Sequence, residues 1–285
     1  MVSLDSLRQP GLWLKAVIGF GGLLLALPGI GVAHERPAGA QYVALGSSFA
    51  AGPGIPPAKP GNAPACGRSA GNYATQVATR LNLTLADVTC SGSTTANILT
   101  TPQSGQGPQI DAVTRDTSLV TMTIGGNDVN YLGSLFAYSC QNNGGTSCAQ
   151  VDRGAMDRAL TTVSDKIGAV ITAVHERAPH ARILVVDYFT ILPLSGRLCP
   201  GIGLTEDEVQ YELSVARRLK VATWKATATG RATLIDLAVK SVAHDGCADV
   251  PWVERSTTAP GRVPYHPNEA GMTAAANLIL QRLQH

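Results

Sequence analysis

Two residues that could act as a nucleophile and its base lie near opposite ends of the chain. Ser48 follows a short apolar run in the segment ALGSSFAAG at residues 44–52, where a serine hydroxyl can face solvent. Serine is a weak nucleophile at its free pKa and needs a general base. His266, in the segment PYHPN at residues 264–268, is the most constrained of the histidines and a candidate base. Taken alone, the serine is better explained by a turn and the histidine by a structural role.

Two further segments could offer hydrogen-bond donors to an anion. The segment SGSTT at residues 91–95 places Gly92 before a predicted helix, where backbone N–H groups are exposed. The segment IGGND at residues 124–128 contains Asn127, whose side-chain amide could point into the same space. The alternative for both segments is a structural role, because Ser, Thr, Asn and Gly also cap helices and form turns.

These four segments need a scaffold that brings several strand ends together. Hydrophobic patterning predicts strands at residues 42–45, 83–90, 119–124, 182–186 and 233–237, and helices at 72–81, 156–178, 206–229 and 268–283. Thr205 and Glu208 could form a capping box before the third of these helices. The alternation predicts an α/β protein, a three-layer α/β/α sandwich around a parallel sheet of about five strands. Ligands bind beyond the carboxyl ends of such strands, which here points to the chain from Gly46, from Cys90 and from Gly125 onward.

Composition narrows the class of protein further. The 285 residues include 22 Lys and Arg against 20 Asp and Glu, a net charge of +2, and 45% are hydrophobic. A near-balanced charge argues against nucleic acid as a partner, because phosphate binding needs a concentrated basic face. The apolar content is sufficient for a folded core. With no internal repeat and no long linker, we expect residues 34–285 to form one domain.

The N-terminal segment carries the marks of export. Arg8 and Lys15 precede an uncharged run at residues 16–33, which contains LLLAL and ends in small residues. This order of basic, apolar and small-residue regions predicts a secretory signal peptide over residues 1–33 and a secreted or cell-envelope protein. The alternative is an uncleaved membrane anchor, since 18 residues approach the length of a membrane span.

Cysteine usage agrees with export. All six cysteines follow the predicted signal peptide, and an even count in a secreted chain indicates disulfides. Fifteen connectivities are open; the sequential pairing is our hypothesis, with the short loop between Cys140 and Cys148 the easiest to close. That pairing would join Cys66 to Cys90, Cys140 to Cys148, and Cys199 to Cys247. A metal site is a weak alternative, because the chain has no C-x-x-C motif.

Together, the four segments resemble the SGNH, or GDSL, hydrolases, and the resemblance runs from residue 41 to about 283. The basis of this resemblance is the order Ser, Gly, Asn, His across successive strand ends. The resemblance implies the flavodoxin-like SGNH hydrolase fold, with Ser48 as nucleophile and His266 as base. It implies an oxyanion hole built from the Ser48 and Gly92 N–H groups and the Asn127 amide. The signal peptide and six cysteines are similar to the secreted actinobacterial esterase and lipase branch.

The sequence departs from the family pattern at two positions. Ser47 stands where the family has the aspartate of Gly-Asp-Ser, which is not the catalytic acid. Val263 stands three residues before the histidine, where the family usually has the aspartate of a triad. A backbone carbonyl can also orient a catalytic histidine, and some secreted relatives use one. We therefore expect a Ser48–His266 dyad with the Val263 carbonyl as the orienting group; Asp245, Asp249 and Glu254 lack the spacing of a substitute.

The function expected from this resemblance is a secreted esterase or lipase that hydrolyses small-molecule or lipid acyl esters through an acyl-enzyme. We expect no cofactor and no metal, a monomer, and contact with the cell envelope or a membrane surface. The alternatives are a carbohydrate acetylesterase, an acyltransferase, and a non-catalytic cell-envelope protein on the same fold. The segments 131–149 and 190–203 are expected to border the cleft.

Overall fold

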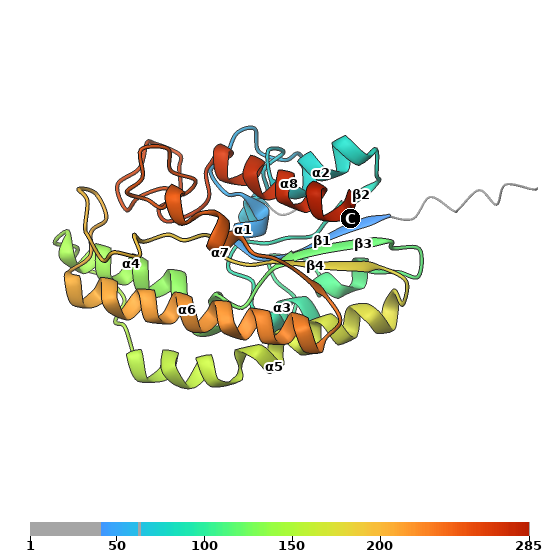
Figure 1. Ribbon diagram of the computed structural model, residues 1–285, viewed down its shortest axis with the longest axis horizontal. Coiled ribbons are helices and arrows are strands. Elements are labelled where there is room, and N and C mark those ends of the chain that lie inside the picture. Colours follow the sequence, from blue (N-terminus) through green and yellow to red (C-terminus); the bar gives the residue numbers. More distant parts are fainter. Residues whose placement is uncertain (1–40, 62–63, 285) are drawn as a thin grey trace, which may run out of the picture. The chain divides into compact units, whose positions relative to one another are not determined.

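The computed structural model describes residues 41–61 and 64–284, and all its strands belong to one parallel sheet (Figure 1). The strands are β1 (Tyr42–Gly46), β2 (Leu85–Asp87), β3 (Leu119–Thr123), β4 (Arg182–Val186) and β5 (Thr233–Ile235). Their order across the sheet is β2-β1-β3-β4-β5, and every neighbouring pair is parallel. This is the flavodoxin-like order of a doubly wound fold. Strand β2 is added on one side of β1, and β3, β4 and β5 are added in turn on the other side.

Helices cover both faces of the sheet and bury its strands. The helices are α1 (Ser48–Ala51), α2 (Tyr73–Leu81), α3 (Thr95–Leu99), α4 (Tyr131–Asn142), α5 (Arg153–Arg177), α6 (Glu206–Thr229), α7 (Leu237–Lys240) and α8 (Glu269–Gln284). Helices α2 and α8 pack together on one face, and α3, α5 and α6 lie on the other (Figure 1). Every residue of β1 and β3 is buried, as expected for central strands of a sheet covered on both sides. The predicted three-layer α/β/α sandwich is confirmed.

Local signals in the sequence account for most of the long elements. Helix α6 and strand β4 occupy the predicted residues, and Thr205 and Glu208 form the predicted capping box. Helix α2 begins after Asn72, whose side chain accepts a hydrogen bond from the Thr75 N–H. The patterning did not predict the short helices α1, α3 and α7 or the 12-residue α4. Strand β2 is shorter than predicted at both ends, and at its start Leu83 still closes the end of α2, with its N–H bonded to Ala78 O.

Three disulfides connect the cysteines in sequential order. They join Cys66 to Cys90, Cys140 to Cys148, and Cys199 to Cys247, so the hypothesis of sequential pairing is confirmed. Two of the bridges join cysteines 24 and 48 residues apart, and the third closes a span of eight residues at the end of α4.

The predicted signal peptide at residues 1–33 lies outside the described residues. Within the described part of the chain, no helix has the length and apolar character needed to cross a membrane.

Candidate active site

A glycine-dependent turn brings Ser48 to the end of β1. Gly46 has φ +124°, and a Cβ added there would lie 2.5 Å from the Thr123 carbonyl oxygen, so a side chain does not fit. The Ser47 N–H donates to that same carbonyl at 3.0 Å, and the chain then turns directly into α1. Ser48 is the first residue of α1, and its side chain is therefore fixed at the carboxyl edge of β1.

A second constrained turn places His266 against this serine. Tyr265 has φ +60°, an uncommon conformation for a residue other than glycine, and its hydroxyl donates to the Ile202 carbonyl at 2.5 Å. The buried Tyr265 thus anchors the loop that precedes α8. His266 Nε2 lies 2.8 Å from Ser48 Oγ, although 218 residues separate the two in sequence. This distance suits direct proton transfer between a nucleophile and its base.

The carbonyl that orients the histidine is not the predicted one. His266 Nδ1 lies 2.8 Å from the Pro264 carbonyl oxygen, whereas the Val263 carbonyl accepts the His266 backbone N–H at 3.3 Å. The expectation for Val263 was wrong by one residue. The Val263 carbonyl closes the turn with its own backbone bond, and the positive φ of Tyr265 swings the ring toward the next carbonyl. With Nδ1–H donated to Pro264, the tautomer leaves the Nε2 lone pair free to accept the Ser48 proton.

No carboxylate is needed to fix this tautomer, and the acidic residues near His266 have other partners. Asp245 accepts the Cys247 N–H at 2.7 Å, and Glu269 pairs with Arg262. Glu254 touches the histidine only through the backbone, where its N–H donates to the His266 carbonyl at 2.8 Å.

The environment of His266 keeps the imidazole neutral. Phe49 and Phe136 flank the ring with centroid distances of 5.2 and 5.9 Å, the second in a stacked arrangement. Burial lowers the pKa of His266 to about 4, and the hydrogen bond to the Pro264 carbonyl opposes that shift. The ring is therefore an unprotonated acceptor at neutral pH. Phe136 comes from α4, so the segment 131–149 does border the site as expected.

The predicted donors Gly92 and Asn127 are held by hydrogen bonds around them. Gly92 has φ +81°, and within residues 41–61 and 64–284 neither its N–H nor that of Ser48 has a hydrogen-bond acceptor. Asn127 Nδ2 donates one proton to the Ser93 carbonyl at 2.8 Å, which fixes the amide and leaves its second proton for another acceptor. A set of available N–H donors is what an oxyanion requires.

A buried polar network joins the Ser48 turn to the Gly92 turn, and the sequence analysis missed it. Gln109 accepts the Gly46 N–H at 2.7 Å through Oε1, and its Nε2 donates to the Gly46 carbonyl at 3.0 Å and to Ser93 Oγ at 2.8 Å. Ser93 Oγ donates to Gln103 Oε1 at 2.5 Å, and Gln103 Nε2 donates to the Ser91 carbonyl at 2.8 Å. Nothing in the local sequence marks these glutamines, because their partners are distant in the chain.

Asp128 supplies a third tie between the loops. Its buried carboxylate accepts the Thr95 N–H at 2.9 Å and the Thr95 hydroxyl at 2.7 Å, with Lys166 Nζ 3.7 Å away. Asn127 and Asp128 therefore hold the start of α3 from two adjacent positions. The motif at residues 124–128 was noticed in the sequence, but only its asparagine was given a role.

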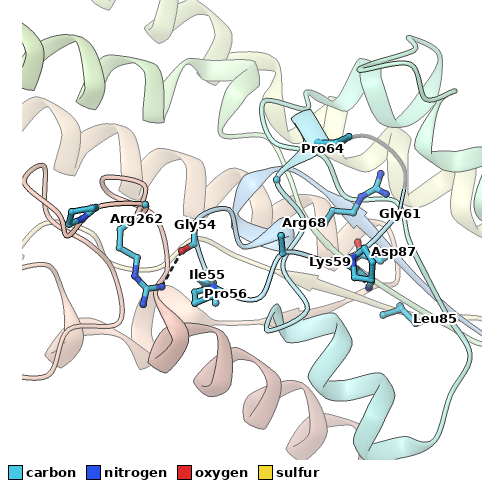
Figure 2. Close-up of a pocket in the computed structure, with 15 residues that line it drawn as sticks. Gly54, Ile55, Pro56, Lys59, Gly61, Pro64, Arg68, Leu85, Asp87 and Arg262 are labelled. Carbon is cyan, nitrogen blue, oxygen red and sulfur yellow. Dashed lines mark hydrogen bonds and ion pairs between the residues drawn. The ribbon is translucent and has the colours of Figure 1, made fainter.

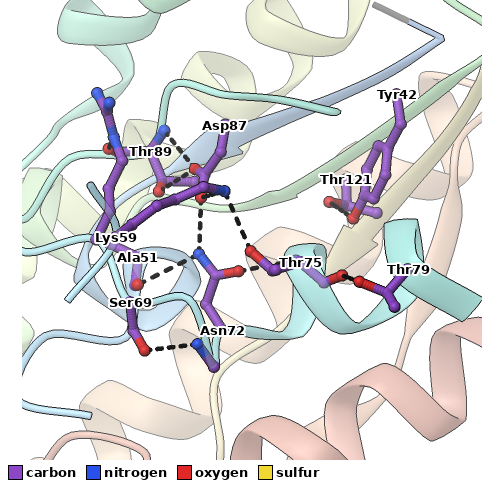
Figure 3. A network of polar contacts seen from close by, with 12 residues as sticks. Tyr42, Ala51, Lys59, Ser69, Asn72, Thr75, Thr79, Asp87, Thr89 and Thr121 are labelled. Atoms are coloured by element: carbon purple, nitrogen blue, oxygen red, sulfur yellow. Dashed lines mark hydrogen bonds and ion pairs between the residues drawn. The ribbon is translucent and has the colours of Figure 1, made fainter. Parts of the chain in front are cut away.

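A similar network fixes the chain that follows α1 (Figure 3). Asn72 Nδ2 donates to the Ala51 carbonyl at 3.3 Å and to Asp87 Oδ2 at 2.8 Å, and Lys59 Nζ reaches the same carboxylate oxygen at 3.0 Å. The Thr89 hydroxyl donates to the other carboxylate oxygen, Asp87 Oδ1, at 2.6 Å. The end of the nucleophile helix is thus tied to β2 and α2 through one buried carboxylate.

A cavity of about 940 Å³ lies beside this network (Figure 2). Lys59, Arg68 and Arg262 line it, with Arg262 also donating to the Gly54 carbonyl and pairing with Glu269. Neither Ser48 nor His266 lines this cavity. Its three cations have partners within the protein: Lys59 pairs with Asp87, Arg68 donates to the Thr89 carbonyl, and Arg262 pairs with Glu269.

The fold brings a serine hydroxyl and a neutral histidine together at the carboxyl edge of a five-stranded parallel sheet, an arrangement typical of serine hydrolases. The model of the GDSL-like lipase/acylhydrolase family matches residues 44–274, and the chain belongs to that family. It is an enzyme of the lipase and esterase kind.

Proteins of known name and structure agree with this assignment. The chain is 34% identical over 274 residues to "Lipase 2" of Streptomyces coelicolor, covering 90% of both chains. The crystal structure of the extracellular lipase from Streptomyces rimosus matches with a TM-score of 0.69 at 26% identity, covering 84% of this chain and 98% of that one. A phospholipase A1 structure from Streptomyces albidoflavus also matches at 0.69, but at 23% identity it supports only the fold.

Proposed function

We propose that this protein is a secreted serine esterase or lipase that hydrolyses carboxylic esters through a Ser48–His266 dyad. The observation that carries the proposal is the 2.8 Å contact between Ser48 Oγ and Nε2 of a neutral histidine whose other nitrogen is bonded to a backbone carbonyl. Nucleophile, base and orienting group are the three parts that activation of a serine needs.

In the first step, His266 Nε2 takes the Ser48 proton as Oγ attacks the ester carbonyl carbon. The tetrahedral oxyanion then accepts hydrogen bonds from the Ser48 and Gly92 N–H groups and the Asn127 amide. His266 returns the proton to the departing alkoxide, which leaves as an alcohol. Water, deprotonated by the same nitrogen, hydrolyses the resulting acyl-enzyme and releases the acid.

The Pro264 carbonyl orients the imidazole but brings no full negative charge. An imidazolium formed in the transition state is therefore stabilised by a dipole in this dyad, where a triad would offer a carboxylate. The phenylalanines on both sides of the ring exclude water, which strengthens that dipolar interaction.

Small-molecule and lipid esters are the proposed substrates, and the lipase names of the relatives support this class. Secretion is supported by the basic and apolar N-terminal sequence, by three disulfides, and by the extracellular lipase among the structural matches. We propose that the mature protein acts as a monomer at the cell envelope or outside the cell.

Hydrolysis of p-nitrophenyl esters from C2 to C16 tests the proposal, with Ser48→Ala as the paired variant. We expect the wild-type protein to hydrolyse part of the series and Ser48→Ala to lose that activity. The preferred chain length separates an acetylesterase from a lipase, and product analysis with added alcohol separates hydrolysis from acyl transfer. An active Ser48→Ala protein would refute the dyad.

Asn127→Ala tests the oxyanion hole separately. Loss of one donor typically lowers kcat by about 10²–10³-fold while leaving KM little changed. Asn277→Ala is the control, because it removes an exposed amide side chain from the surface of α8. Equal kcat values for Asn127→Ala and wild type would remove Asn127 from the mechanism.

A further inference from the structure

A second cavity lies between α6, α7 and the loop after β4, apart from the proposed catalytic residues. Its volume is about 460 Å³, within the range of small-molecule sites in proteins. Neither Ser48 nor His266 lines it. An aromatic layer separates the two places, since Phe49 packs against His266 at 5.2 Å and against Tyr188, a lining residue of the cavity, at 4.8 Å.

The floor of this cavity carries a buried carboxyl group that the fold uses only in part. Asp187 follows β4 directly and is 1% exposed. Its Oδ1 accepts the Ala238 N–H at 3.0 Å, but its Oδ2 has no hydrogen-bond partner among the described residues. A buried polar atom without a partner is rare in folded proteins and destabilises the fold unless a ligand or water satisfies it. This oxygen is the first reason to look for a ligand here.

Apolar side chains form much of the wall and rim of the cavity, beside the polar Gln210, Arg217 and Lys220, of which Lys220 pairs with Asp236. Ile191, Leu192 and Leu213 line its wall, and Leu194, Val239 and Val242 lie at its rim with exposed fractions of 61%, 52% and 40%. Large exposed aliphatic side chains that gather around one opening mark a binding site for apolar material. The cavity thus combines one buried carboxyl group, that of Asp187, with aliphatic side chains that continue to the protein surface.

The chemistry of Asp187 favours one kind of headgroup. Burial is the main cause that raises the pKa of Asp187 to about 7, so protonated and ionised forms coexist at neutral pH. The ionised form needs a donor, and the protonated form offers one. A hydroxyl group can do both, whereas an ammonium group suits only the ionised form and a carboxylate only the protonated form.

We propose that this cavity is a binding site for a single-chain amphiphile with a hydroxyl head, a long-chain alcohol or monoacylglycerol. The hydroxyl meets Asp187 Oδ2 at the floor, and the hydrocarbon chain runs along Leu192 and Leu213 to the exposed rim. The inference concerns binding alone and does not depend on the proposed esterase activity.

Calorimetric titration of the purified protein at pH 7 with 1-octanol and with methyl octyl ether tests the headgroup. The ether keeps the oxygen and the chain but cannot donate a hydrogen bond. We expect saturable binding of 1-octanol and at least about tenfold weaker binding of the ether, the size of one hydrogen bond to a buried acceptor. Equal affinity for the two, tighter binding of octanoate than of 1-octanol, or no saturable binding would overturn the proposal.

A filled cavity tests the location. Ala216 lines the cavity from α6, so Ala216→Trp should weaken 1-octanol binding at least about tenfold, and Ser214→Trp provides a second filling variant on the same helix. Ala228→Trp is the matched control, because Ala228 is an exposed alanine of α6 outside the lining.

The same variants separate this site from the proposed active site. Ser48→Ala should bind 1-octanol like the wild-type protein, and Ala216→Trp should hydrolyse a short p-nitrophenyl ester like the wild-type protein. Wild-type affinity in both folded filling variants, or loss of binding in Ser48→Ala, would place the alcohol elsewhere and refute the proposal. A protein without esterase activity that still shows this binding pattern would refute the proposed function alone.

Discussion

Burial sets the protonation state of His266. Phe49 and Phe136 pack against the ring, and burial lowers the pKa of His266 to about 4. The neutral form of His266 therefore persists to more acidic pH than that of an exposed histidine. The Pro264 carbonyl then selects the tautomer that leaves Nε2 unprotonated. A base in this state accepts the serine proton without first losing one of its own.

The pH dependence of kcat/KM follows from this pKa. Because the histidine must be neutral to act as a base, activity should fall as pH drops through about 4 and stay level from about 5.5 to 8. Initial rates on a short p-nitrophenyl ester, taken within seconds of dilution into each buffer, measure the profile. An acid limb centred near 6.5 would contradict the argument.

At the scale of elements, the site depends on how four loops are held at one sheet edge. Gln109 bonds both backbone groups of Gly46 and reaches Ser93 beside Gly92, so one side chain connects the turn before Ser48 to the turn at Gly92. Asp128 adds a connection from the end of β3 to α3. These side chains do not touch the reacting atoms in the proposed mechanism; they position the groups that do.

Gln109→Met tests this positioning role. The substitution keeps the chain length and removes every hydrogen bond of the amide, leaving the buried Gly46 groups and Ser93 without that partner. We expect the free energy of unfolding to fall by about 2–3 kcal/mol. We also expect kcat to fall by a larger factor than KM rises, because the donors move relative to Ser48.

Urea denaturation and steady-state kinetics measure the two effects. Gln150→Met is the control, since Gln150 is exposed on the loop before α5. Wild-type kcat in a destabilised Gln109→Met protein would assign Gln109 to stability alone.

Helix α6 buries an acidic residue whose ionisation opposes the fold. Glu212 is 0% exposed and faces Ser134 of α4, whose hydroxyl proton goes to the Tyr131 carbonyl at 2.8 Å. Burial raises the pKa of Glu212 from 4.5 to about 8. The folded protein therefore retains a proton that the unfolded chain releases.

Stability should consequently decline as pH rises from about 4.5 to 8. Below 4.5 both states hold the proton, and across this window only the folded state does, so each pH increment favours unfolding. Glu212→Gln should raise Tm at pH 8.5 by at least about 2–4 °C and change it less at pH 5. Thermal scans of both proteins measure the difference, and equal shifts at the two pH values would disprove the linkage.

At the scale of the whole molecule, disulfides bind the loops around the site. Cys66–Cys90 spans 24 residues and joins the chain after α1 to the Gly92 turn. Cys199–Cys247 spans 48 residues and joins the loop after β4 to the segment that leads toward His266. Cys140–Cys148 closes only an eight-residue span at the end of α4.

The stabilising effects of the three bridges should follow their spans. Chain entropy predicts a loss of about 4 kcal/mol on removing Cys199–Cys247, about 3.4 for Cys66–Cys90 and about 2.5 for Cys140–Cys148. Paired Cys→Ala variants compared by urea denaturation measure this order. A Cys140→Ala/Cys148→Ala protein less stable than the other two would contradict it.

The sequence by itself determined the five strands and the helices α2, α5, α6 and α8, and it named the candidate residues Ser48, Gly92, Asn127 and His266. Patterning predicted β4 and α6 at their observed bounds, because a buried strand needs a continuous apolar run and a helix needs an apolar stripe and a cap. Each of Ser48, Gly92, Asn127 and His266 is locally explained by a turn, a cap or a structural role, and it was their order along the chain, which resembles the SGNH hydrolases, that selected them.

Only the tertiary structure decided which groups meet. The choice of Pro264 over Val263 depends on the positive φ of Tyr265, which is held by a bond to Ile202, 63 residues away. Gln109 and Asp187 look ordinary in sequence, and their roles arise from burial against partners contributed by other elements. Hydrogen bonds and pKa values depend on distance and desolvation, which one-dimensional spacing does not contain.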